Sequence, residues 1–196
     1  MRIFLTGVSC IGKTTLGKIL AERLQYPFFD LDEEIELYFG ESIERLRSRY
    51  LTGHSLRYEV GAIALKDIIF KRNSSDSVIA LPPSGLKDAY SKTIKKVTGI
   101  VVAITDAPEN ILKRITFYDI DSKLIQKELS DEETAYHLKE IKKDITYFGK
   151  TYKRAHVMVD IAGLSIENSV SRIQDTVQSY FGDAFERKYQ EWKTRD

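Results

Sequence analysis

Eight consecutive residues near the start of the chain have the composition of a phosphate-binding loop. The pattern G-x-x-x-x-G-K-[ST] is matched in full by Gly7, Val8, Ser9, Cys10, Ile11, Gly12, Lys13 and Thr14, and Thr15 follows. Glycine at both ends allows backbone torsions that other residues resist, so successive N–H groups can face one phosphate. The lysine can then reach the β- and γ-phosphates of a nucleotide, and the threonine hydroxyl can bind Mg²⁺.

Two simpler interpretations of this loop stay open. It can be a glycine-rich turn that only joins two elements, or a loop that binds a nucleotide without catalysis. Its position favours phosphate binding, because an apolar strand-like segment, 2–6, precedes it and a helical pattern, 14–24, follows it. Cys10 is either a small residue that fills space in the loop or a redox-sensitive thiol.

A pair of acidic residues ends the next predicted strand, which opens with Phe28 and Phe29 and closes with Asp30, Leu31 and Asp32. Asp30 and Asp32 stand two positions apart at its carboxyl end, so we expect both side chains to point into the crevice where such sheets bind ligands. A carboxylate there can hold Mg²⁺-bound water or accept a hydroxyl proton. Capping of the following helix is the alternative role for both.

The rest of the pattern predicts an α/β fold, a parallel sheet with helices on both faces, in one domain over 1–196. Further strands are predicted at 77–81, 99–105 and 156–160. Further helices are predicted at 33–39, 42–49, 55–70, 91–96, 135–147 and 165–180, and one more begins at 108.

Residues from 117 to about 134 are charged and poorly periodic, which predicts a mobile lid. In the tail, Phe185, Tyr189 and Trp192 have helical spacing, which predicts packing or an interface.

Composition narrows the class of protein. Lys plus Arg is 30 and Asp plus Glu is 29, so the net charge of +1 gives no general attraction to nucleic acid. The single cysteine fits a reducing compartment, and the three scattered histidines lack the spacing of a zinc site. No signal peptide is recognisable, and no apolar run approaches the roughly 20 residues of a membrane helix. We therefore expect a cytoplasmic protein with neither nucleic acid nor membrane as partner.

Residues 2–66 resemble the shikimate kinase family of P-loop small-molecule kinases. The resemblance rests on GVSCIGKTT (7–15), FFDLDEEIE (28–36), FGESI (39–43) and GHSLRYE (53–59), and it is weaker beyond 66. It implies five parallel strands in the order 2-3-1-4-5, a substrate-binding segment at about 32–66 and a lid that closes over ATP. It also implies ATP and Mg²⁺ as cofactors, a small-molecule substrate with hydroxyl and carboxylate groups, and a monomer.

The resemblance also implies roles for single residues. Lys13 and Asp30 would be catalytic, with Asp30 near Mg²⁺ and the reacting hydroxyl. Asp32 would bind substrate hydroxyls, Arg57 would bind the substrate carboxylate through its planar fork, and Arg114 would pack on adenine. A solvated helix face is the alternative for both arginines. Asp106, which resembles a metal-binding aspartate after a strand, is instead expected to cap the helix that begins at Pro108.

Three departures from the family pattern concern the acceptor. A glycine run after the third strand is replaced by Leu81-Pro82-Pro83-Ser84-Gly85, so Pro83 and Ser84 would line an altered pocket. The lid lacks the family's arginine, for which Lys123 is the nearest candidate. The family's second carboxylate-binding arginine is also missing, and the candidates to replace it are Lys143, Lys150 and Arg154.

These observations favour transfer of the γ-phosphoryl group of ATP to a hydroxyl of a small metabolite, with shikimate as the first candidate and shikimate 3-phosphate as the product. A nucleoside, nucleotide or sugar acid as acceptor is the second hypothesis. A regulator that binds a nucleotide without turnover is the third, and the missing lid arginine motivates it.

Overall fold

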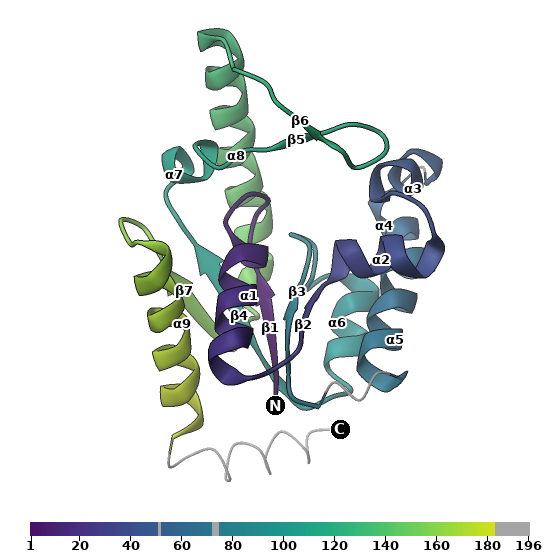
Figure 1. Ribbon diagram of the computed structural model, residues 1–196, viewed down its shortest axis with the longest axis vertical. Helices are drawn as coiled ribbons and strands as arrows, with labels where there is room; N and C mark the ends of the chain where they lie inside the picture. The colour runs from purple at the N-terminus through teal and green to yellow at the C-terminus, as the bar shows by residue number, and fades with distance from the viewer. Residues whose placement is uncertain (51, 72–74, 183–196) are drawn as a thin grey trace.

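Figure 1 shows the chain as a computed structural model, which describes residues 1–50, 52–71 and 75–182. Five parallel strands form the central sheet in the order β2-β3-β1-β4-β7. Their bounds are β1 Arg2–Thr6, β2 Phe28–Asp30, β3 Ser77–Ala80, β4 Gly99–Thr105 and β7 Val157–Asp160. The predicted α/β class and strand order are confirmed, with β7 as the fifth strand of the sheet.

Helices cover both faces of this sheet (Figure 1). On one face lie α1 (Lys13–Leu24), α7 (Pro108–Leu112), α9 (Ile166–Phe181) and the end of α8 (Asp131–Tyr152). On the other face lie α2 (Leu31–Phe39), α3 (Ile43–Arg49), α5 (Ala62–Lys71) and α6 (Asp88–Ile94). No helix of the described ranges is both long and apolar enough to cross a membrane.

Strand β1 lies at the centre of the sheet and supplies both hydrophobic cores. Ile3 and Leu5 point into the core under α1 and α9, whereas Phe4 points into the core under α2 and α5. All three side chains are fully buried, as the alternation of side chains along a strand covered on both faces requires. The strand therefore fixes the position of the loop that leaves its carboxyl end.

The predicted helix at 55–70 is three consecutive helical pieces. A short α4 (Gly53–Leu56) leads into a π-helical turn (Arg57–Gly61) and then into α5. The π-helical turn, which is wider than an α-helical one, begins at Arg57 and ends at Gly61. Gly61 packs against the buried ring of Tyr90 on α6. Such turns are often found at functional sites.

The predicted lid contains a small antiparallel hairpin of β5 (Phe117–Tyr118) and β6 (Leu124–Ile125). The predicted helix bounds, 135–147, were wrong, because α8 spans Asp131–Tyr152. Helix α8 begins at Asp131 because Ser130 and Glu133 form a reciprocal capping box. The predicted aromatic helix of the tail lies outside the described residues.

We expect Gly61→Ala to destabilise the protein by about 1–3 kcal/mol through overpacking. A Cβ atom at Gly61 would lie 1.8 Å from the Tyr90 hydroxyl oxygen, in a contact between α6 and the π-helical turn. Gly149→Ala is the matched control, because a Cβ atom there meets nothing within 4 Å. That change should stabilise helix α8 by about 0.5–1 kcal/mol. Urea unfolding measures both, and equal effects would contradict the packing at Gly61.

A pH-dependent loss of stability is expected from His156, next to β7. Its Nδ1 accepts the Val101 backbone N–H at 2.9 Å, which only a ring without a proton on that nitrogen can do. Burial also lowers the pKa of this imidazole. The unfolded chain therefore binds a proton more readily, so stability is full above the ordinary pKa of about 6.5 and falls as the pH drops below it.

His156→Asn keeps an acceptor near the same amide but cannot titrate. Thermal unfolding between pH 8 and pH 5 should therefore show a smaller loss of Tm in this variant than in the wild type. The exposed His54 serves as the control site, and His54→Asn should retain the wild-type pH dependence. The same acid-induced loss in His156→Asn would refute this assignment.

Candidate active site

The loop between β1 and α1 has the backbone shape of an anion cradle. Gly7, Cys10 and Gly12 have φ values of 157°, 59° and 105°. A Cβ atom at Gly7 would lie 2.9 Å from the backbone oxygen of Ile104 in β4, so only glycine fits this approach. The loop amides meet the N-terminal end of α1, where a helix attracts anions. The arrangement supports the prediction that Gly7 to Thr15 bind phosphate.

Lys13 lies across this loop. Its Nζ donates to the backbone oxygens of Gly7 at 3.0 Å and of Val8 at 2.9 Å. Desolvation lowers the pKa of this ammonium group, and the nearby carboxylates of Asp32 and Asp30 oppose that shift. A cation that is removed from water interacts strongly with any phosphate brought beside it.

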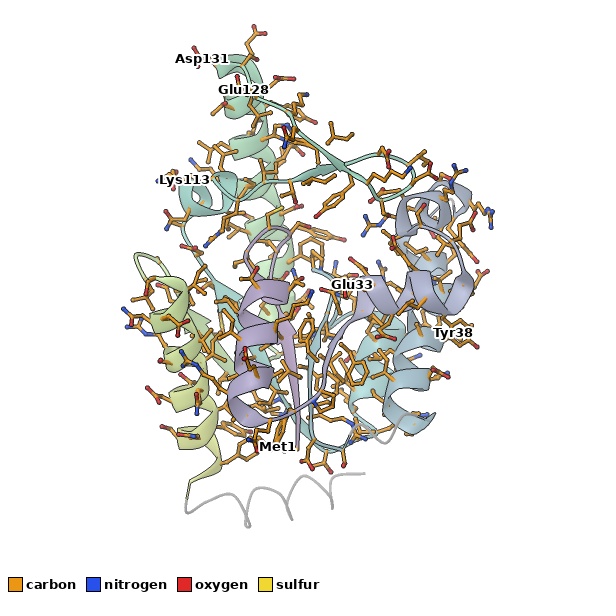
Figure 2. All side chains as sticks on the ribbon, in the orientation of Figure 1. Met1, Glu33, Tyr38, Lys113, Glu128 and Asp131 are labelled. Atoms are coloured by element: carbon orange, nitrogen blue, oxygen red, sulfur yellow. The ribbon has the colours of Figure 1, made fainter. Side chains whose placement is uncertain are left out.

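Asp30 joins the phosphate loop to the next helix. Its Oδ2 accepts the Thr14 hydroxyl at 2.6 Å, and its Oδ1 accepts the backbone N–H of Asp32 at 3.1 Å. Asp30 is thus the N-cap of α2, so the capping role was correct for this residue while it also contacts Thr14. Glu33, labelled in Figure 2 at the end of α2 that faces α1, pairs with Lys18 at 3.5 Å.

Asp32 does not lie on the strand as predicted. β2 ends at Asp30, and Asp32 is in the first turn of α2, so the helix rather than strand alternation directs its side chain. Desolvation raises the pKa of the Asp32 carboxyl, although Arg47, 3.5 Å away, opposes the shift. The buried Tyr90 phenol lies close enough for the Asp32 charge to raise its pKa further. Arg47 and Tyr90 were not singled out from the sequence.

Arg57, the predicted carboxylate-binding residue, is bonded to a carboxylate of the chain itself. Its Nε and Nη2 both donate to Oδ2 of Asp88, at 2.8 and 2.6 Å. The pair is largely enclosed, with 19% of the Arg57 side chain and 33% of the Asp88 side chain exposed. Asp88 adopts φ of 47°, a left-handed backbone that Asp tolerates better than most residues. Sequence reasoning missed Asp88, because only the fold brings it to Arg57.

The loop after β3 presents carbonyl groups to neighbouring elements. The Pro83 backbone oxygen accepts the Tyr152 hydroxyl at 3.1 Å, and the Ser84 backbone oxygen accepts the N–H of Lys87 at 2.8 Å. Arg154 donates to the backbone oxygen of Leu86. Pro83 and Ser84 therefore lie near the end of β3 as predicted, and Arg154 is engaged with the loop itself.

Of the predicted replacement lysines, Lys143 pairs with Glu140 at 2.5 Å, and Lys143 and Lys150 both line a cavity of about 960 Å³ along α8. Lys123 is exposed in the turn of the hairpin, where its backbone N–H donates to the Asp119 carboxylate at 2.9 Å. None of these contacts brings a lysine to the phosphate loop or to Arg57.

The hairpin extends from the α7 and α8 side of the molecule to α2 and α3 (Figure 1). Its turn is held by Ser42, which donates to the Ile120 backbone oxygen at 2.5 Å, and by the Arg45–Asp121 ion pair at 2.7 Å. The upper end of α8, where Figure 2 labels Asp131, stands clear of the sheet. The lid segment thus reaches the helices of the predicted substrate-binding segment.

Asp106 and Arg114 form an ion pair beside α7. The expected capping role of Asp106 needs correction, because Ala107 is the N-cap of α7. Asp106 accepts the backbone N–H of Ala107 at 2.7 Å and the amide of Asn110 at 2.8 Å, and these bonds together with Arg114 hold the pKa of its carboxyl low despite desolvation. Arg114 is 40% exposed, so its predicted contact with adenine stays a prediction.

Thr14 and Asp30 supply two adjacent oxygen ligands. Among the described residues no group of three or more His, Cys, Asp or Glu side chains could hold a metal ion. A magnesium ion that shares its ligands with phosphates and water needs only one or two protein side chains, which is what Thr14 and Asp30 offer. The donor set therefore fits Mg²⁺ in the presence of a nucleotide.

Comparison with known proteins gives one consistent family. The family model described as shikimate kinase matches residues 9–178. The chain is 30% identical to a shikimate kinase of Chlorobium phaeobacteroides, over 91% of this chain and 87% of that protein. It is 29% identical to one of Geobacter sulfurreducens, over 91% of each. The crystal structure of shikimate kinase from Bacteroides thetaiotaomicron superposes with a TM-score of 0.71 at 25% identity, covering 91% of this chain and 98% of that one.

Proposed function

Because this chain belongs to the shikimate kinase family, we propose that it transfers the γ-phosphoryl group of ATP to a hydroxyl of shikimate. Membership makes it a phosphotransferase with an alcohol acceptor. The observation that carries the proposal is the junction of Lys13, Thr14 and Asp30, where a phosphate cradle meets the first turn of α2. The product, shikimate 3-phosphate, belongs to aromatic amino acid biosynthesis.

On the nucleotide side, the chain supplies positioned positive charge. The amides of residues 7–14 face the phosphates, and the ammonium group of Lys13 leaves the carbonyls of Gly7 and Val8 for phosphate oxygens. Charge on the transferred group spreads over its oxygens in the transition state, so a fixed ammonium group lowers the barrier. Arg114, held beside α7 by Asp106, is proposed to border the adenine.

For the metal, we propose that Thr14 and Asp30 hold Mg²⁺, directly or through water. When bound, the ion neutralises phosphate charge and orients the transferred group. The two side chains already share a hydrogen bond of 2.6 Å, so the hydroxyl and carboxylate oxygens lie close enough together to bind one metal ion.

On the acceptor side, Asp32 and Arg57 are proposed to bind the substrate. The carboxylate of Asp32 can accept hydrogen bonds from hydroxyl groups, and its raised pKa makes it a stronger base than an ordinary aspartate. Arg57 begins the π-helical turn and can offer its remaining N–H groups to a carboxylate. Pro83 and Ser84, after β3, are proposed to border the same space.

A second candidate is a kinase for an acceptor without a carboxylate. The Arg57–Asp88 pair favours it, because a carboxylate of the chain already neutralises this arginine. A coupled assay that follows ADP formation with shikimate and with a panel of nucleosides and neutral polyols separates the two. Turnover with shikimate well above the acceptor-free rate is expected, and no such turnover would refute the proposal.

The cytoplasmic location and the monomeric state of this protein stay predictions.

Lys13→Ala should reduce kcat for shikimate phosphorylation by at least a hundredfold. The variant loses the ammonium group that contacts the developing charge, while the loop amides remain. The same ADP-release assay measures the loss, and circular dichroism checks that the fold is retained. Lys18→Ala, on the exposed side of α1, is the control and should keep the wild-type rate. A near-normal rate in Lys13→Ala would remove this residue from catalysis.

Asp30→Asn should raise the Mg²⁺ concentration needed for half-maximal activity by about tenfold or more, because a carboxylate binds a hard cation better than an amide does. The asparagine oxygen still caps α2, so the fold should persist. Glu33→Gln removes a neighbouring charge that does not contact Thr14 and should leave the Mg²⁺ titration unchanged. Identical titrations for Asp30→Asn and the wild type would exclude Asp30 as a metal ligand.

A further inference from the structure

The guanidinium of Arg57 has N–H donors left over, but the carboxylate of Asp88 balances its charge. Asp88 takes Nε and Nη2 through one carboxylate oxygen, so three of the five N–H groups of the guanidinium remain. Its Nη1 points toward Gly53, since a Cβ atom there would lie 3.0 Å from it. An acceptor carboxylate can reach the free donors, but it meets an ion pair whose total charge is zero. A second cation is therefore needed beside this pair.

Lys87 is a cation close to that pair. It precedes Asp88 in the chain, and its Nζ lies 3.7 Å from the ring centroid of Tyr147 and 5.1 Å from that of Phe148. Within 1–50, 52–71 and 75–182, no carboxylate forms an ion pair with it. Its charge is therefore balanced by the faces of two rings, which stabilise a cation without neutralising it.

The same neighbourhood contains the Arg57–Asp88 pair. Lys87 lowers the pKa of the Tyr147 phenol through a hydrogen bond and its charge, and the charges of Arg57 and Asp88 also act on that phenol. Lys87 and Asp88 follow the loop after β3, at the carboxyl edge of the sheet where ligands of parallel α/β folds bind. Of the candidates from the sequence, Arg154 donates to the Leu86 carbonyl beside Lys87, and Lys143 pairs with Glu140.

We propose that Lys87 binds the carboxylate of the acceptor together with Arg57. Lys87 supplies the positive charge that is needed because Asp88 already balances the charge of Arg57. This inference rests on the proposed function, since it assigns the group that recognises the acceptor's carboxylate. Arg57 and Asp88 sum to zero, the acceptor carboxylate adds one negative charge and Lys87 balances it. A lysine suits this task because it contributes a compact charge on a flexible stem.

The test is Lys87→Met, which keeps the apolar stem against Tyr147 and removes the charge. The KM for shikimate should rise about tenfold to a hundredfold, as expected for the loss of one charge-assisted contact, whereas KM for ATP and kcat stay within twofold. Lys87→Arg should recover most of the affinity. Lys95→Met, which removes an exposed lysine at the end of α6, is the control and should match the wild type.

An acceptor analogue whose carboxylate is replaced by a carboxamide separates charge recognition from a structural effect. With this analogue, Lys87→Met and the wild type should have the same KM, because no charge is left for Lys87 to bind. An equal penalty with both acceptors, or an unchanged KM for shikimate, overturns the inference while leaving the kinase activity established. A wild-type chain that neither phosphorylates shikimate nor binds it in calorimetry overturns the proposed function, and the role of Lys87 with it.

Discussion

The carboxylate of Asp30 connects the two halves of the site. One of its oxygens accepts the Thr14 hydroxyl at the start of α1, and the other accepts the first-turn amide of α2. The predicted nucleotide side and the predicted acceptor side are therefore both hydrogen-bonded to one planar carboxylate. In-line transfer requires the attacking oxygen and the phosphorus atom to be held about 3–3.5 Å apart and in line, and a carboxylate shared by both sides helps to fix that geometry.

Around this junction, each charged side chain lies near a side chain of opposite charge. Desolvation pushes the pKa of Lys13 down and that of Asp32 up, and each group opposes the shift of the other. Removal from water makes every charge contact stronger, but it requires that each charge have a partner. Arg47 is the partner of Asp32, and Asp88 is the partner of Arg57. A substrate that enters must replace or extend these contacts, so the internal partners influence which acceptor fits.

The sequence predicted what depends on local pattern. The phosphate loop, the buried strands β1 and β4 and the strand order follow from glycine positions, apolar runs and a family resemblance. The Arg57–Asp88 pair could not be predicted, because 31 positions separate its members and Asp88 needs a left-handed backbone. The side-chain direction of Asp32 was missed because β2 ends at Asp30, two residues before the end that strand alternation assumed. The start of α8 was readable, since Ser130 and Glu133 have capping-box spacing.

Glu36 links the acceptor side to the lid. It lies one turn after Asp32 on α2, and its Oε1 accepts both the backbone N–H of Ile43 at 2.7 Å and the hydroxyl of Ser122 in the hairpin at 2.5 Å. Helix α2, the start of α3 and the hairpin therefore meet at one carboxylate oxygen. Any displacement of α2 relative to the hairpin must therefore move or break the contact with Ser122. The hydrogen bonds of Glu36 thus connect the helix that contains Asp32 to the predicted lid (Figure 1).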